Sequence, residues 1–325
     1  MSRQHEPNPS AAPVQRLRLR YAKRGRLRFT SHRDVARAFE RALRRAGVPM
    51  AYSQGFNPHP KISWAGAAPT GVASEAEYVE IQLVERVDPE VLRAELDAAL
   101  PDGLDVLQVV PASGGSLADR LDASLWRIEL PGVDPRALAE AVDRLLAADR
   151  VEVQRLTKDG RRTIDVRPAV VTAEAASSVA GAGGSPDRVE SGPLRRRFPD
   201  DEEIASNGTS VPGRGERTAD NVAHGSQIGT RAARTDDWPA PGRPCGILVT
   251  VVRQATPAVR PDDVLSALRV VAGLEPPVPA KATRMAQGQL DDDGRLADPL
   301  APVAAPQPAT RDGESGQGVV AGPAV

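Results

Sequence analysis

Two histidines near the N-terminus have side chains that could do chemistry, and His59 is the more unusual of them. It lies between Pro58 and Pro60, which fix φ on either side and favour an extended geometry for the histidine. A ring that is held in place before binding loses less entropy when it binds, which suits a general base, a phosphate-binding donor or a metal ligand. A structural turn, in which His59 bonds only a backbone carbonyl, explains the same pattern.

His32 is the second candidate, because it follows Ser31 at the expected start of a helix. The helix dipole disfavours an imidazolium there, so a neutral ring could contact a ligand or simply belong to the capped first turn. His59 and His32 are the candidate catalytic residues, each as a general base. A metal would need both rings and a carboxylate such as Asp34 or Glu77 in one place, and we expect no metal site.

The segment "AYSQGFNPHPKISWAG", residues 51–66, combines aromatic, basic and turn-forming residues. Phe56 and Trp64 could stack on nucleic-acid bases or anchor the loop in the core. Lys61 and Ser53 are candidate contacts to a phosphate or a carboxylate. The ligand-binding residues predicted in this segment are Ser53, Phe56, His59 and Lys61.

Positive charge is concentrated at one end of the chain. The net charge is −1 over 325 residues, whereas residues 14–68 contain thirteen Lys or Arg and two acids, a net charge of +11. A basic block with interleaved aromatic residues is typical of nucleic-acid contact, although a solvated face or salt bridges explain it too. We expect Glu75 and Glu77 to pair with arginines. The arginines predicted to bind an anion are Arg16, Arg18, Arg20, Arg33, Arg37 and Arg41.

The periodicity of the first half predicts four strands and two helices. "RLRLRY" alternates apolar and basic residues as a half-buried strand does. A stripe of apolar residues at helical spacing follows, with Ser31 and Asp34 at capping-box spacing and Gly47 at its end. The expected elements are a strand at 16–21, a helix at 31–46, strands at 49–53 and 77–85, a helix at 88–100 and a strand at 103–111.

The second half repeats this order of patterns, so we predict an α+β fold of two tandem ferredoxin-like (split βαβ) halves. Pro135 and Pro261 stand at the first positions of two helical segments. In such a fold the helices cover one face of the sheet, and Arg16, Arg18 and Arg20 would stand on the open face. The expected elements are a strand at 124–132, a helix at 134–148, a hairpin of 151–157 with 161–171, a strand at 245–254, a helix at 260–274 and a strand at 280–287.

Composition separates folded from disordered parts. The chain has 28 glycines and 30 prolines, and residues 172–243 in particular are rich in Gly, Ser, Ala, Pro and charge with almost no apolar periodicity, which is typical of disorder. The predicted organisation is a disordered lead at 1–14, a basic first half at 15–112, a second half at 122–171 plus 244–287, a disordered insertion at 172–243 and a disordered tail at 288–325.

Several kinds of chemistry are excluded by residue usage. Cys245 is the only cysteine, so the chain alone cannot form a disulfide, a cysteine-ligated iron–sulfur cluster or a zinc ribbon. It has no P-loop and no strand-linked dinucleotide fingerprint. No apolar stretch is long enough for a membrane span, and residues 1–13 lack the apolar region of a secretory signal. We expect a cytoplasmic protein without a cofactor of its own.

One long run of residues resembles a known family. "FTSHRDVARAFERALRRAGVPMAYSQGFNPHPKISW", followed by "GVASEAEYVEI", is similar to the radical SAM-linked protein family, a bacterial domain of unknown function. "TKDGRRTIDVRPAV" resembles a second block of that family. The resemblance implies a domain fused to, or encoded beside, a radical S-adenosylmethionine protein that often has a cobalamin-binding region. That partner would carry the iron–sulfur cluster and S-adenosylmethionine.

Three functions are compatible with these residues. The first is a non-catalytic accessory module that holds RNA or another anionic substrate for a separate radical enzyme. The second is a metal-independent endoribonuclease with His59 or His32 as general base and Lys61 or an arginine as charge stabiliser, which is a fold-level analogy. The third is an adaptor whose basic face docks an acidic protein.

Overall fold

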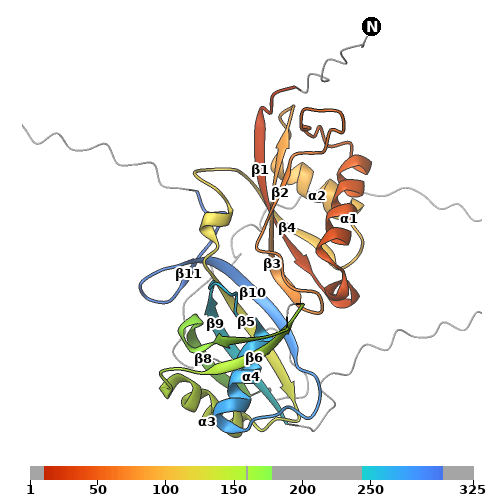
Figure 1. Cartoon of the computed structure of the whole chain (residues 1–325). Helices are drawn as coiled ribbons and strands as arrows, with labels where there is room; N and C mark the ends of the chain where they lie inside the picture. Colours follow the sequence, from red (N-terminus) through yellow and green to blue (C-terminus); the bar gives the residue numbers. More distant parts are fainter. Residues whose placement is uncertain (1–10, 159, 178–243, 303–325) are drawn as a thin grey trace, which may run out of the picture. The chain divides into compact units, whose positions relative to one another are not determined.

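The computed structural model describes residues 11–158, 160–177 and 244–302 (Figure 1). It is a mixed α+β structure with four α-helices, in which sheet makes up most of the core. The chain divides into two compact units. The first contains residues 1–126, 251–258 and 283–325, and the second contains residues 127–250 and 259–282. Strands β5 (Ala123–Pro131) and β9 (Cys245–Arg253) begin in one unit and continue into the other.

The first unit follows the predicted order of strand, helix, strand, strand, helix, strand. Its elements are β1 (Gln15–Lys23), the 3-10 helix η1 (Gly25–Phe29), α1 (His32–Arg45), β2 (Ile62–Ala65), β3 (Ala73–Leu83), α2 (Pro89–Ala99), β4 (Leu104–Pro111) and the 3-10 helix η2 (Ala118–Arg120). The strand expected at 49–53 is wrong in position. Only isolated bridges form at Met50 and Tyr52, and β2 follows the loop because Ile62 and Trp64 supply the alternating side chains that the core accepts.

The sheet of the first unit is centred on β1, which pairs antiparallel with β3 on one side and with β4 on the other. β2 also pairs antiparallel with β3, and β10 (Lys281–Leu290) runs parallel to β3 at Thr283 and Arg284. Successive side chains of a strand point to opposite faces, so Leu17, Leu19 and Tyr21 share one face. They pack with the apolar stripes of α1 and α2 into one core cluster.

The second unit contains α3 (Pro135–Ala147), β6 (Glu152–Thr157), β7 (Gly160–Asp165), the 3-10 helix η3 (Arg167–Ala169), β8 (Val170–Ser177) and α4 (Pro261–Ala272). The predicted hairpin is confirmed as β6 and β7, which pair antiparallel and form a separate two-stranded sheet. Its second strand, expected at 161–171, is wrong in length, because β7 ends at Asp165 and η3 separates it from β8. β8 is the strand that lies next to β9 in the order β5-β9-β8. Whether each unit is a ferredoxin-like repeat stays a prediction.

Two predicted disordered boundaries are wrong. Residues 172–177 belong to β8, and the remainder of the predicted insertion, 178–243, lies outside the described residues. The tail was expected to begin at 288, yet β10 continues to Leu290, β11 (Leu296–Ala297) pairs with it, and Leu300 is only 4% exposed. The few leucines of this segment stand among acidic residues and proline and give no continuous periodic signal, so the burial of Leu300 could not be predicted.

None of the helices within the described ranges is both long and apolar enough to cross a bilayer.

Candidate nucleic-acid interface

The three arginines of β1 lie on the sheet face opposite α1 and α2, and that face is not open. Leu117, Leu121 and Leu300 cover part of it by packing with Tyr78 of β3 and Ala65 of β2. The prediction that these arginines stand on an open face is therefore wrong for Arg18, which is buried, whereas Arg16 is exposed and Arg20 is half-buried. It failed because the segment around η2 and the residues after β11 supply apolar side chains that need to be buried.

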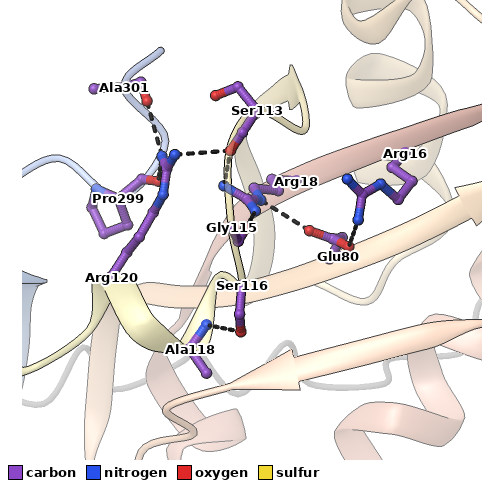
Figure 2. A network of polar contacts seen from close by, with 10 residues as sticks. All are labelled: Arg16, Arg18, Glu80, Ser113, Gly115, Ser116, Ala118, Arg120, Pro299 and Ala301. Carbon is purple, nitrogen blue, oxygen red and sulfur yellow. Dashed lines mark hydrogen bonds and ion pairs between the residues drawn. The ribbon is translucent and has the colours of Figure 1, made fainter. Parts of the chain in front are cut away.

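Arg18 is held inside the protein. It is 1% exposed, and its Nε donates to Oε2 of Glu80 at 2.9 Å (Figure 2). Its other nitrogens donate to the carbonyl of Ser113 at 2.8 Å and to the carbonyl of Gly115. A guanidinium with these three partners has little capacity left for a ligand, so Arg18 fastens the segment around η2 to the sheet.

Arg120 fastens the same segment from its other side. Its guanidinium donates to the carbonyls of Ser113 at 2.8 Å, Pro299 at 2.9 Å and Ala301 at 3.0 Å (Figure 2). The carbonyl of Ser113 thus accepts hydrogen bonds from both Arg18 and Arg120. These hydrogen bonds attach Pro299 and Ala301 to the segment around η2, although residues 288–325 were predicted to be disordered.

Arg16 and Arg20 are engaged less completely. Arg16 lies 3.6 Å from Oε1 of Glu80, with its side chain 50% exposed. Arg20 lies opposite Tyr78 on β3. Burial raises the pKa of Tyr78 to about 12, while the nearby Arg20 acts in the opposite direction. Of the three β1 arginines, Arg18 is therefore the one that serves the inside of the first unit.

A second group of buried charges was missed by sequence reasoning in part. Arg284 donates to the carboxylate of Glu77, whose Oε2 accepts from the N–H of Ala68 at 3.1 Å. Lys23 donates to the carbonyls of Ala68 at 3.1 Å and Pro69 at 3.2 Å, and burial lowers its pKa. The expected pairing of Glu77 with an arginine is confirmed, but the partner is 207 positions away, and no local pattern identifies it. Glu75 likewise pairs with Arg24.

Helix α1 forms where the sequence predicts it. Ser31 is the N-cap, and its hydroxyl accepts from the N–H of Asp34 at 3.3 Å, which satisfies one of the free amides of the first turn. Val35, Phe39 and Leu43 are buried against the sheet. All five arginines of the helix consequently fall on the solvent side, and each is exposed.

These α1 arginines contrast with those of β1 because most lack an acidic partner. Arg37 lies 3.5 Å from Asp34, both side chains being more than half exposed, and Arg45 donates to the carbonyl of Ala99. Among the described residues, Arg33, Arg41 and Arg44 take part in no ion pair within 4.0 Å. The exposed arginines of the α1 face are Arg33, Arg37, Arg41, Arg44 and Arg45.

The loop after α1 is closed at its base. The N–H of Ser53 donates to the carbonyl of His59 at 2.8 Å, and the N–H of His59 donates to Oγ of Ser53 at 3.0 Å. Ser53 therefore acts as a clamp, which gives its hydroxyl a structural role beside the predicted ligand contact. Phe56 at the tip is 80% exposed, so it does not anchor the loop in the core.

Trp64 and the two histidines take different positions. Trp64 packs edge-on against Tyr21, His32 and Phe39 at 5.2–6.0 Å between ring centroids, so it belongs to the core and holds His32 at the start of α1. After His59, Pro60 forms an isolated bridge with Tyr52, and Ile62 to Ala65 pair with β3.

The two histidines have different immediate neighbours, because His32 contacts the ring of Trp64 whereas His59 closes the loop with Ser53. No group of three potential metal ligands occurs in the parts of the chain that the structure describes. Neither histidine ring has a hydrogen-bonding partner among those residues that would select its tautomer.

The fold and this surface define a mixed α+β protein with an arginine-covered helix beside a clamped loop. The sequence matches the family DUF2344, described as an uncharacterized protein conserved in bacteria, over residues 16–191. Because this match spans more than half of the chain, the protein belongs to that family. No curated protein matches the sequence.

Proposed function

We propose that this protein binds RNA through the α1 face and acts as a non-catalytic accessory to a separate radical S-adenosylmethionine enzyme. The observation that carries the proposal is that Arg33, Arg41 and Arg44 are exposed and form no ion pair among the described residues. Lys and Arg that neutralise phosphates release counterions from a polyanion, and this release drives association.

The spacing of these arginines adds a second argument. Arg33, Arg37 and Arg41 follow one another at intervals of four, and Arg45 continues the series. Like charges at this spacing on a helix destabilise it by about 0.2–0.5 kcal/mol per pair. Only Asp34 and Glu40 offset them within α1. A surface that repels itself in this way is stabilised when a polyanion covers it.

The role as an accessory rests on the resemblance to the radical SAM-linked family and on the chemistry of the lone cysteine. Cys245 is 2% exposed, and burial raises the pKa of its thiol, whereas a metal ligand must be a thiolate. A partner that supplies its own cysteines would hold the cluster. This chain would then present the anionic substrate.

The test measures binding of the full-length protein to a fluorescent RNA oligonucleotide at several salt concentrations. Affinity should fall steeply with salt, with a slope of about −0.7 per phosphate contact on a single strand. The variant Arg33→Ala/Arg41→Ala/Arg44→Ala should lose most of the affinity and reduce the slope by about two.

A matched control is Arg136→Ala/Arg144→Ala/Arg253→Ala, which removes the same charge from exposed positions elsewhere and should bind as the unsubstituted protein does. Absence of binding at low salt, or equal losses in the two triple variants, would refute the proposal. RNA cleavage that disappears in His32→Ala/His59→Ala would instead favour the endoribonuclease alternative. Co-purification with a radical SAM protein after nuclease treatment would favour the adaptor alternative.

A further inference from the structure

The exposed aromatic side chains of the described residues all flank α1. Phe29, directly before the helix, is 60% exposed, and Tyr52 and Phe56, which follow it, are 40% and 80% exposed. The remaining aromatic residues in the described ranges are buried or half-buried, namely Tyr21, Phe39, Trp64, Tyr78 and Trp126. An arginine-covered helix therefore has solvent-facing aromatic rings next to both of its ends in the sequence.

The ring of Phe56 is presented by a preorganised loop. The two hydrogen bonds between Ser53 and His59 close its base, and the N–H of Lys61 donates to the carbonyl of Ala51 at 2.8 Å below them. Between the clamping residues the tip contains no acidic or basic side chain. An exposed aromatic ring on a fixed support loses little conformational entropy when something covers it.

Phe29 has a related environment. The guanidinium carbon of Arg28 lies 4.6 Å from the centroid of its ring, so a cation already contacts this ring while more than half of the residue stays exposed. Arginines beside aromatic rings supply both phosphate neutralisation and a surface for bases.

We propose that Phe56 and Phe29 are stacking platforms for unpaired bases, so that the RNA held by the α1 face is single-stranded. This inference rests on the proposed function and specifies its substrate class. Bases inside an A-form duplex are stacked on one another and present only their edges, whereas unpaired bases can be splayed out onto aromatic side chains. The α1 arginines contact phosphates and the two phenylalanines contact base faces, which gives tight binding with little dependence on sequence.

The experiment compares a single-stranded oligonucleotide with a duplex of the same sequence, using the full-length protein at fixed salt. Phe56→Ala should weaken single-strand binding by between about 5-fold and 150-fold and leave duplex binding unchanged. Phe29→Ala should act in the same direction. Phe56→Tyr should bind normally, whereas Phe56→Leu should behave like Phe56→Ala, because it keeps the apolar surface but loses the ring. The control Val91→Ala removes another exposed apolar side chain, which is 54% exposed on α2, and should leave binding to both RNAs unchanged.

A second measurement reports on stacking directly. Phe56→Trp places an indole at the tip of the loop, and the fluorescence of this indole should be quenched by the single strand but not by the duplex. Subtracting the fluorescence of the unsubstituted protein isolates the signal of the new indole from that of the other tryptophans. Arginine-dependent binding that is equal for both RNAs and insensitive to Phe56→Ala would overturn this inference and leave the proposed function standing. The stacking inference would also be overturned if Phe56→Ala lost binding to a protein partner while its RNA binding stayed intact. If the unsubstituted protein binds neither RNA, the proposed function itself fails.

Discussion

The arginines of β1 and those of α1 are close in sequence but differ in solvent exposure and in their bonding partners. Arg18 is 1% exposed and bonds one carboxylate and two carbonyls. Arg41 is exposed and takes part in no ion pair among the described residues. Both belong to the same stretch of net charge +11. The comparison shows that the charge of this block divides into an internal part that holds the first unit together and an external part that is available to a ligand.

The division follows from what covers each face. The face of the sheet under α1 is filled by the helix stripes, so the arginines of α1 lie on the solvent side of the helix. The opposite face is covered by Leu117, Leu121 and Leu300, and Arg18 is enclosed with them. A buried guanidinium must find hydrogen-bonding partners inside the protein, and Glu80 with the segment around η2 supplies them.

The largest expected effect is on the internal side of this comparison. Arg18→Met should reduce the free energy of unfolding by about 3–5 kcal/mol, because it leaves Glu80 largely buried with its main partner removed. Chemical denaturation measures it directly. Arg33→Ala, an exposed control, should stay within about 0.5 kcal/mol of the unsubstituted protein. A small effect at Arg18 would mean that Glu80 finds water or Arg16 instead, and that this face is more open than the structure shows.

The next prediction uses the pH dependence of stability to test whether Tyr78 is buried on the sheet face opposite α1. The pKa of Tyr78 is raised by burial to about 12, so between pH 10 and 12 the folded protein keeps a proton that the unfolded chain loses. Stability must therefore fall as pH rises through this window. Tyr78→Phe should reduce the loss of unfolding free energy between pH 10 and pH 12 by roughly 2–3 kcal/mol. Denaturation curves at pH 9 and pH 12 provide the comparison, and equal slopes for both proteins would contradict a buried phenol.

Much of the fold was predictable because its signals are local. The helices begin at capped positions such as Ser31, Asp88 and Asp134, and each is observed there. The alternation in β1 predicted that strand correctly, and the expected hairpin is observed as β6 and β7, although β7 ends at Asp165 and not at residue 171. What failed depends on distant pairing. The third element was expected at 49–53, before the loop, whereas β2 follows the loop at Ile62–Ala65. Both segments are short, and only the pairing with β3, which is distant in sequence, distinguishes them.

The candidate site was predictable to the same extent. The helical period correctly puts Arg33, Arg37 and Arg41 outside, because the apolar stripe alone determines which way they point. A strand period places Arg16, Arg18 and Arg20 on one face but cannot say what lies against that face. The clamp between Ser53 and His59 was also beyond prediction, since it depends on how a seven-residue loop closes.

A smaller effect is expected at the boundary between the two sets. Arg16 is half exposed and 3.6 Å from Glu80, which is the geometry of a solvent-screened ion pair. Arg16→Ala should cost about 0–1 kcal/mol in the free energy of unfolding, and added salt should reduce that difference. A loss comparable to that of Arg18→Met would show that Arg16 belongs fully to the internal set.

The smallest effect should have the opposite sign and would sharpen the comparison most. Arg41 stands at helical neighbour positions to Arg37, Arg44 and Arg45, so Arg41→Ala removes three repulsive pairs and introduces a stronger helix former. We expect the free energy of unfolding to rise by up to about 1 kcal/mol at low salt, and the gain to shrink as salt screens the charges. Arg136→Ala on α3 is the control for the change to alanine.

The same Arg41→Ala protein should bind RNA less tightly than the unsubstituted protein. Greater stability combined with weaker binding distinguishes a surface that binds a ligand from one that only contacts solvent. An Arg41→Ala protein that is less stable than the unsubstituted one would place Arg41 with the internal arginines.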